Sequence, residues 1–340
     1  MGTPRQRIGI KEVAAAAGVS VTTVSHALNG KGRLPEETRE RVRRIADELG
    51  YRPNATARNL VVGKTGLLGL AVSQQGGAPL AVTDFAYFAQ LMMAASTEAI
   101  ANGYALVMAP GDAALNPQAG IAVDGAIIVD PVRDDGLVAQ LQQAGIAVVT
   151  TGRLPGGDAP SCWVDNDHIA GTTEMLDHLE RRGARRIALM TSALDISYSH
   201  DVEQAYADWC ERRGAEPLLR RAASDLTERA GYAVASELLS LPEPPDAIFS
   251  TYDRLAFGTL LAAEARGVRV PDDLLLATTA TESQAPDEAR PSLTTLDLNP
   301  EEIGRSAAGL LVDLLEEQEP AQRHVLVPHR VIARASTGRP

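Results

Sequence analysis

The clearest chemical signal in the sequence is a basic segment at its beginning. Residues 1–66 carry twelve Lys and Arg against six Asp and Glu, a formal charge of +6. The other residues carry a formal charge of −18, which gives the whole chain its net charge of −12. Clustered basic side chains attract phosphate groups, while an acidic body stays away from a polyanion. The charge pattern indicates either contact with nucleic acid or a solvated helical face, and both explanations remain open on charge alone.

The sequence contains no recognised motif or residue spacing for catalysis or metal binding. The sequence has no GxSxG or HExxH motif, no GxGxxG after a strand, and its six His form no ligand cluster. Gly63-Lys64-Thr65 ends like a P-loop, but Arg58 stands where that motif needs a Gly. Cys162 and Cys210 lack any zinc-binding spacing. We therefore predict no enzyme, no cofactor and no metal site.

Three short helices are expected to position the basic residues, at 10–17, 21–28 and 35–49. Gly18 stops the first helix, and Ser20 is a good N-cap for the second. The tight corner between them predicts a helix-turn-helix whose second helix enters the major groove, although any three-helix bundle shares the pattern. The apolar residues expected to form the core are Val13, Val24, Val42, Ile45 and Leu49.

The same residues match a known family in register. The runs at 10–14 (IKEVA), 17–20 (AGVS), 23–30 (TVSHALNG), 38–42 (TRERV) and 49–54 (LGYRPN) closely resemble the head of the lactose-repressor (LacI/GalR) family of bacterial transcription regulators. The resemblance implies a sequence-specific DNA-binding head.

The resemblance also implies which head residues contact double-stranded DNA. Val21, Thr22 and His26 would read bases, with Val21 against a thymine methyl and His26 donating to guanine. His26 stands where the family more often has Arg. Phosphate or sugar contacts are implied for Lys11, Ser20, Thr23, Asn29, Arg33 and Thr38, and further DNA contacts for Ser25, Tyr51 and Asn54.

Residues 54–62 resemble the family's hinge helix. About nine residues are too few for a stable isolated helix in water, so this segment needs support. By resemblance, Ala57 lies where two hinges meet, Leu60 enters the central base step and Arg58 reaches the phosphate or groove wall. A buried linker contact is the alternative for Leu60. Two hinges at one step imply a homodimer on a pseudo-palindromic operator.

From Leu67 onward, short apolar runs alternate with amphipathic stretches, which predicts two doubly wound parallel sheets with a cleft at the carboxyl ends of their strands. The resemblance extends here, with anchors such as Val164-Asp165-Asn166, and implies a periplasmic-binding-protein-like body. Strands are expected at 67–72, 104–108, 125–129, 147–151, 186–191, 247–250 and 274–278, and helices at 84–102, 134–144, 167–182, 200–213, 226–240, 253–266 and 300–317.

The expected organisation is a DNA-binding head at 1–53, a hinge and linker at 54–66, and an effector-binding and dimerisation body at 67–340. Within the body, the resemblance implies one subdomain at about 67–163 and 297–323 and another at about 164–296 and 324–340. The chain is expected to cross between the two near 162–165, 295–299 and 322–326.

The body departs from the family at the ligand pocket. Val202 stands where sugar-binding members have an Arg, Gly152 where an Asp is usual, and Tyr252-Asp253 where an Asn-Asp pair is usual. Losing these groups removes the bidentate contacts that hold sugar hydroxyls. We therefore expect a less polar effector, or none, rather than an ordinary hexose. Candidates for lining the cleft, by position, are Tyr87, Asp130, Arg153, Tyr198, Tyr252 and Asp253.

Together these patterns predict a homodimeric transcription regulator, a repressor of a metabolic operon controlled by a small molecule. The direction of the effector's action stays open. A DNA-binding regulator without an effector is the alternative, and neither an enzyme nor a solute-binding protein on the same body explains the head. No signal peptide or membrane span is recognised, so we expect a cytoplasmic protein, nucleoid-associated when bound to DNA.

Overall fold

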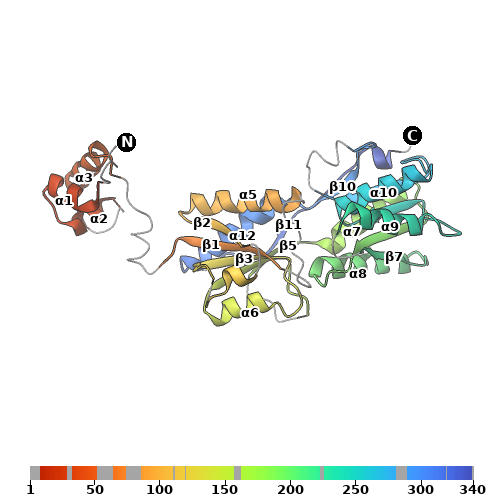
Figure 1. Ribbon diagram of the computed structural model, residues 1–340, viewed down its shortest axis with the longest axis horizontal. Helices are drawn as coiled ribbons and strands as arrows, with labels where there is room; N and C mark the ends of the chain where they lie inside the picture. Colours follow the sequence, from red (N-terminus) through yellow and green to blue (C-terminus); the bar gives the residue numbers. More distant parts are fainter. Residues whose placement is uncertain are drawn as a thin grey trace, which may run out of the picture. The chain divides into compact units, whose positions relative to one another are not determined.

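The computed structural model divides into two compact units, Met1–Gly66 and Leu67–Pro340 (Figure 1). The residues it describes are 8–28, 33–51, 64–73, 86–109, 112–118, 120–156, 162–222, 226–280, 289–318 and 320–338.

In the first unit, the three predicted helices are confirmed as α1 (Ile10–Ala17), α2 (Val21–Leu28) and α3 (Glu36–Glu48). Gly18 ends α1 with a φ of 63°, which glycine adopts without a Cβ clash. The Ser20 hydroxyl accepts a hydrogen bond from the Thr23 amide at 3.1 Å and so caps α2. The core consists of Val13, Ala14, Ala17, Val24, Ala27, Val42 and Ala46, with Ile45 packed against it.

One predicted core residue of the first unit is misplaced. Leu49 is 36% exposed, because α3 ends at Glu48 and the chain turns away before the apolar stripe completes another turn.

The second unit begins with a six-stranded parallel sheet in the order β11-β5-β4-β3-β1-β2. Helices α5 (Ala86–Ala101) and α12 (Pro300–Leu315) pack together on one face, and α6 (Gly136–Gln143) lies on the other (Figure 1). We call this layer the first lobe. Its strands are β1 (Leu67–Val72), β2 (Ala105–Ala109), β3 (Gly125–Val129), β4 (Ala147–Thr151), β5 (Trp163–Asn166) and β11 (His324–Val327).

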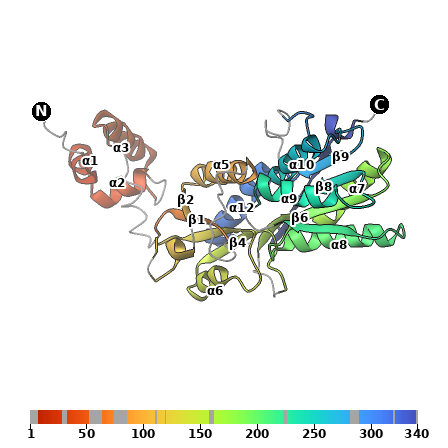
Figure 2. The same cartoon turned by 45° about the vertical axis from the view of Figure 1, so that its right-hand side comes forward.

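A second sheet, in the order β12-β10-β9-β8-β6-β7, forms what we call the second lobe. Only β12 is antiparallel to its neighbour among the described strands of this sheet. Its strands are β6 (Ile187–Ser192), β7 (Leu218–Ala222), β8 (Ala247–Ser250), β9 (Leu275–Thr279), β10 (Thr294–Asp297) and β12 (Arg330–Ile332). Its helices are α7 (His168–Arg181) and α8 (Ser197–Glu211), which contact each other, and the pair α9 (Glu228–Leu238) and α10 (Asp253–Ala265) (Figure 2).

The continuous apolar runs in the sequence correspond to strands buried on both faces. The whole of β3 and β9 is buried, as expected where helices cover a parallel sheet on each side. Short strands at 163–166, 218–222, 294–297 and 330–332 are absent from the sequence prediction, because their brief mixed patterns resemble loops.

The chain crosses between the lobes three times, after β5, after β10 and after β11. The crossings after β5 and β11 lie just beyond the expected ranges of 162–165 and 322–326. Residues 164–166 and 324–327 belong to the first lobe and not the second, because β11 and β5 pair in parallel at its edge. The sequence pattern does not reveal this pairing register.

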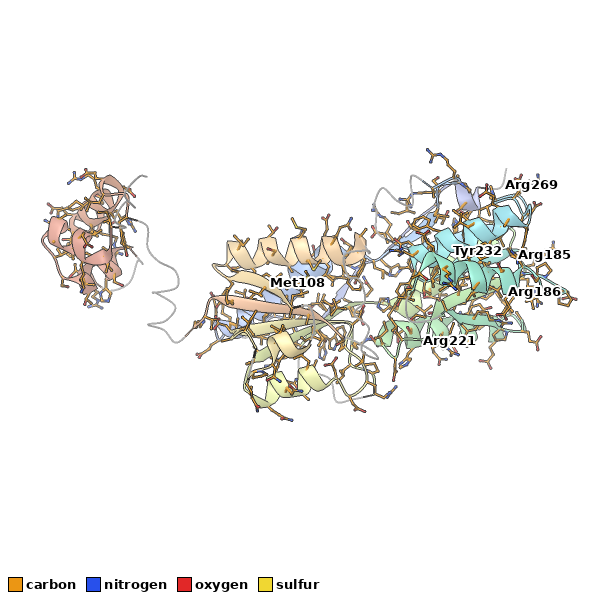
Figure 3. All side chains as sticks on the ribbon, viewed as in Figure 1. Met108, Arg185, Arg186, Arg221, Tyr232 and Arg269 are labelled. Carbon is orange, nitrogen blue, oxygen red and sulfur yellow. The ribbon has the colours of Figure 1, made fainter. Side chains whose placement is uncertain are left out.

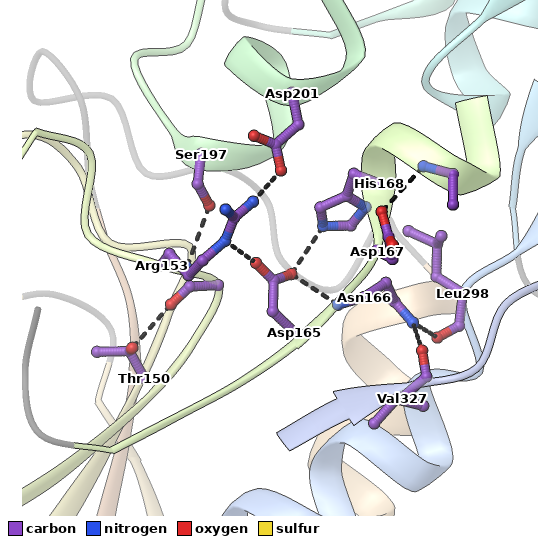
Figure 4. Close-up of polar contacts among 12 residues, drawn as sticks. Thr150, Arg153, Asp165, Asn166, Asp167, His168, Ser197, Asp201, Leu298 and Val327 are labelled. Carbon is purple, nitrogen blue, oxygen red and sulfur yellow. Dashed lines mark hydrogen bonds and ion pairs between the residues drawn. The ribbon is translucent and has the colours of Figure 1, made fainter. Parts of the chain in front are cut away.

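One buried side chain ties the three crossings together. Asn166, 1% exposed, donates from its Nδ2 to the carbonyl oxygen of Leu298 at 3.0 Å and to that of Val327 at 2.7 Å (Figure 4). Asn166, Leu298 and Val327 each lie at a different crossing. The amide group therefore satisfies two buried carbonyls where regular structure ends.

We predict that Asn166→Ala lowers the free energy of unfolding by about 2–4 kcal/mol, because two buried carbonyls lose their donor. Asn102→Ala is the matched control: the exposed Asn102 amide also makes two hydrogen bonds, both to Glu98, and its loss should cost about 1 kcal/mol or less. Urea denaturation measures both. Equal losses would contradict a special role for Asn166.

Candidate nucleic-acid interface and effector pocket

The N-terminal turn of α2 presents the predicted base-reading residues to solvent. Val21 is 41% exposed and Thr22 is also exposed, while His26, one turn further along, is half-buried. Residues four apart on a helix share a face, so Thr22 and His26 lie on one side of α2. An exposed valine beside an exposed threonine suits contact with base edges rather than packing.

The other predicted DNA contacts of the head occupy different environments. Lys11 and Arg33 are exposed, and Ser25, Thr38 and Tyr51 are half-buried. The Thr23 hydroxyl lies 2.9 Å from the Ser20 hydroxyl, so these two side chains bond to each other at the helix cap. Outside the described residues lie Asn29, Asn54, Ala57, Arg58 and Leu60.

An arginine that the sequence reasoning did not select holds two helices of the head together. Arg39, on α3, pairs with Glu36 at 3.5 Å and donates to the backbone carbonyl of His26 on α2 at 3.5 Å. Its side chain is only 13% exposed. This burial distinguishes Arg39 from the exposed basic residues that could meet phosphate.

Several surface arginines of the second lobe are paired with acids. Arg221 bonds to Glu203, and Arg269 pairs with Asp272 at 3.1 Å and Asp273 at 2.8 Å (Figure 3). Their charge is therefore neutralised within the lobe. This agrees with the segregation of free basic charge to the head.

A pocket lies between the two lobes at the carboxyl ends of the strands, where doubly wound sheets bind ligands. Five of the six predicted effector residues line it: Tyr87, Asp130, Tyr198, Tyr252 and Asp253. The remaining lining residues are Phe88, Thr151, Gly152, Val164, Asp165, His168, Thr251, Thr279, Ala280, Leu298 and Ile303.

Arg153, the sixth predicted residue, does not line the pocket but joins the lobes beside it. Its Nε lies 3.0 Å from Asp165 of the first lobe, and its other end pairs with Asp201 on α8 of the second (Figure 4). The Arg153 amide also donates to the Ser197 hydroxyl at 3.1 Å. A second link, Arg133 to Asp195 at 3.2 Å, runs between the lobes nearby.

Asp165 and His168 are pocket residues that the sequence reasoning did not select. His168 Nε2 lies 2.7 Å from Asp165 Oδ1, and both side chains are buried. Burial acts to raise the pKa of Asp165, but His168 and Arg153 beside it bring that pKa below its usual value. The Val164-Asp165-Asn166 motif was the available signal, because a carboxylate after a buried strand lies at the ligand edge.

Asp130 has the opposite environment. Burial in the pocket, reinforced by the negative charge of Asp165 and opposed by His168, raises the pKa of Asp130 to about 7. Its backbone is also left-handed, with a φ of 49°. Burial similarly raises the pKa values of the Tyr87, Tyr198 and Tyr252 hydroxyls, so all three rings remain neutral phenols.

Comparison with known proteins identifies the family. The model for bacterial regulatory proteins of the lacI family matches residues 9–54, and that for the periplasmic binding protein-like domain matches residues 176–337. The HTH-type transcriptional regulator CelR of Thermobifida fusca is 32% identical over 338 residues, covering 96% of this chain and 98% of CelR. The chain belongs to the LacI family.

Two solved structures have the same fold as this LacI-family protein. A CelR–cellobiose complex is 29% identical with a TM-score of 0.71, covering 97% of this chain and 100% of that one. The lac repressor dimer bound to operator and the anti-inducer ONPF is 22% identical with a TM-score of 0.78, covering 98% and 99%. The predicted fold class is confirmed.

Family membership makes the protein a DNA-binding transcription regulator and not an enzyme, as the sequence predicted. Across the part of the chain that the structure describes, no helix has the length and apolar character needed to cross a bilayer.

We predict that Asp130→Asn stabilises the protein increasingly as pH rises from about 4 to 8. The folded carboxyl binds a proton up to about pH 7, whereas the unfolded one loses it near 3.8, so ionisation at neutral pH opposes folding. The gain should approach about 4 kcal/mol at pH 8. Thermal melts across pH measure it. Asp134→Asn, an exposed position with a φ of 53°, is the control and should show no such pH trend.

We predict that Arg153→Ala lowers the free energy of unfolding by about 2 kcal/mol, because buried Asp165 loses its guanidinium partner. Arg133→Ala should cost less than about 1 kcal/mol, since Arg133 and Asp195 are both roughly half exposed. Chemical denaturation compares the two variants. A larger loss in the Arg133 variant would contradict this assignment of the link between the lobes.

Proposed function

We propose that this LacI-family regulator is a homodimeric repressor of a metabolic operon. It binds a pseudo-palindromic operator in the cytoplasm, associated with the nucleoid, and responds to a small molecule between its lobes. In this proposal the head (1–53) and hinge (54–66) bind DNA, while the body (67–340) binds effector and forms the dimer. The pocket carries the proposal, because both lobes line it and a ligand there changes the relative stability of their arrangements.

Base reading is assigned to Val21, Thr22 and His26, and positioning on the DNA backbone to residues around them. The exposure of Val21 and Thr22 supports this division. Contacts that hold the backbone carry no sequence information, so they set register and affinity. The proposed backbone contacts with described positions are Lys11, Ser20, Thr23, Ser25, Arg33, Thr38 and Tyr51.

Exposed apolar side chains on the first lobe support the homodimer. Met93 and Ile100 on α5 are 69% and 66% exposed, and Met108 on the edge strand β2 is 52% exposed (Figure 3). Helix α5 packs beside β2, so the three belong to neighbouring elements. Apolar residues gathered on a surface mark sites of association, and a second copy of this lobe is the proposed partner.

The effector is proposed to bias the hinge through the lobes, with a coupling of about 1–3 kcal/mol. The structure of CelR with cellobiose shows that a relative at 29% identity takes a small ligand. A regulator without an effector is the second candidate. It is favoured by the Arg153 and Arg133 links, which already join the lobes through the chain's own ion pairs.

We predict that selection from a random duplex pool at physiological salt enriches a pseudo-palindrome. Thr22→Ala or His26→Ala should change the preferred bases, because each removes a hydrogen-bonding group aimed at base edges. Arg33→Ala should weaken all sequences alike and reduce the salt slope by about 1, as loss of one phosphate contact does.

Two results would contradict the proposal. An unchanged preferred site in both the Thr22 and His26 variants would show that α2 does not read bases. A pool without any enriched motif would favour a non-specific DNA binder.

A further inference from the structure

The walls of the pocket are unusually aromatic for this chain. The sequence has 4 Phe, 2 Trp and 7 Tyr, and Tyr87, Phe88, Tyr198 and Tyr252 all line this pocket. Tyr87 and Phe88 meet at 84° with centroids 5.4 Å apart, and Tyr198 and Tyr252 meet at 85° and 6.0 Å. Perpendicular rings form corners rather than a flat platform. Corners of this kind surround a compact group, as in the aromatic cages that hold alkylated ammonium ions.

The charged groups of the pocket are acidic. Among the described lining residues are Asp130, Asp165 and Asp253 but no Lys, Arg, Asn or Gln. Asp165 pairs with Arg153 and shares a hydrogen bond with His168. Asp253 lies at the N-terminal end of α10, where the helix dipole favours a negative charge, and accepts a hydrogen bond from the Arg254 amide at 2.7 Å.

Asp130 is the carboxylate left for a ligand. Neither a Lys nor an Arg contributes to its electrostatic environment, whose charged neighbours are Asp165 and His168. Asp130 follows β3 directly and lines the pocket.

Some polar atoms of the pocket are already engaged within the protein. The Tyr198 hydroxyl donates to the Thr251 carbonyl at 3.1 Å and to Thr279 Oγ1 at 2.9 Å, and the Tyr252 hydroxyl lies 3.4 Å from the Ser192 hydroxyl. Within the described residues, the buried His168 Nδ1 and Thr151 Oγ1 have no partner. These two atoms and the Asp130 carboxylate remain for a ligand.

From these observations we propose that the effector is a small organic cation, a compound with a protonated or quaternary amine whose charge lies between Asp130 and the aromatic rings. This inference rests on the proposed function of the pocket as the effector site. The free space of about 70 Å³ holds roughly five waters, so it admits a compact head group. A neutral sugar, by contrast, finds neither a flat ring platform nor a basic or amide donor here.

Matched pairs of probes test the proposal on the full-length protein. Choline is compared with its neutral isostere 3,3-dimethylbutan-1-ol, and glucosamine with glucose, while cellobiose serves as the neutral disaccharide. Titration calorimetry measures each affinity. We expect the cationic member of at least one pair to bind about tenfold more tightly than its neutral partner.

A variant at Asp130 and a matched control distinguish an effect of the lost charge from an effect on folding. Asp130→Asn should reduce binding of the cation by about tenfold and leave binding of the neutral isostere unchanged. Asp134→Asn replaces an exposed aspartate with a similar φ of 53°, outside the pocket lining, and should leave both affinities unchanged. Thermal melts of the two variants verify that each is folded.

The pH dependence gives a further readout. The titratable groups that face Asp130 are Asp165, His168, Tyr87, Tyr198 and Tyr252. Because Asp130 ionises near pH 7, choline, whose charge does not change with pH, should bind more tightly as pH rises from about 6 to 8, with proton release detected in buffers of different ionisation enthalpy.

The outcomes distinguish this inference from the proposed function. Equal or tighter binding of the neutral members or cellobiose, or no binding by either cation, would overturn the cation proposal. Operator binding by the same preparation is measured separately. If the protein binds its selected operator and also binds a neutral ligand, the proposed function stands and only the cation proposal fails. If the protein has no preferred operator, the proposed function itself fails.

Discussion

The body of this regulator depends on one buried side-chain amide, whose hydrogen bonds join the three points where the chain crosses between the lobes. Regular hydrogen bonding ends where β5, β10 and β11 leave their sheets, and the Leu298 and Val327 carbonyls would lack donors there. Asn166 supplies both hydrogen bonds from one side chain that is 1% exposed. The lobes can therefore approach closely around the pocket without leaving two buried carbonyls unsatisfied.

The two units differ in their charge and in how their arginines are paired. The first 66 residues carry a formal charge of +6, whereas several arginines of the body pair with acids on its surface, and Arg153 and Arg133 pair with acids between its lobes. Arg153 lies beside the pocket and removes Asp165 from the groups available to a ligand. The same guanidinium thus links the two lobes, and Asp130 faces the pocket with no Lys or Arg in its electrostatic environment.

The pocket walls consist of aromatic, aliphatic, hydroxyl and carboxyl side chains, and none of the described lining residues is Lys, Arg, Asn or Gln. Val202, for which the family resemblance implies an Arg in sugar-binding members, is buried. A change of ligand chemistry within a constant fold is physically straightforward, because the lining residues come from strand ends and helix starts, whose side chains can vary while the sheets between them stay packed.

Local patterns in the sequence determined the three head helices, the alternating α/β body and five residues of the pocket, since helical spacing, caps and buried strands are set by near neighbours. Tertiary structure decided what depends on distant partners. In the tertiary structure, Arg153 forms an ion pair with Asp201 and does not line the pocket, whereas His168 and Asp165 do line it. Leu49 is exposed, and residues 324–327 pair with β5. The exposure of Leu49 follows from where α3 ends. The other outcomes depend on contacts between segments far apart in the chain, which periodicity and spacing do not encode.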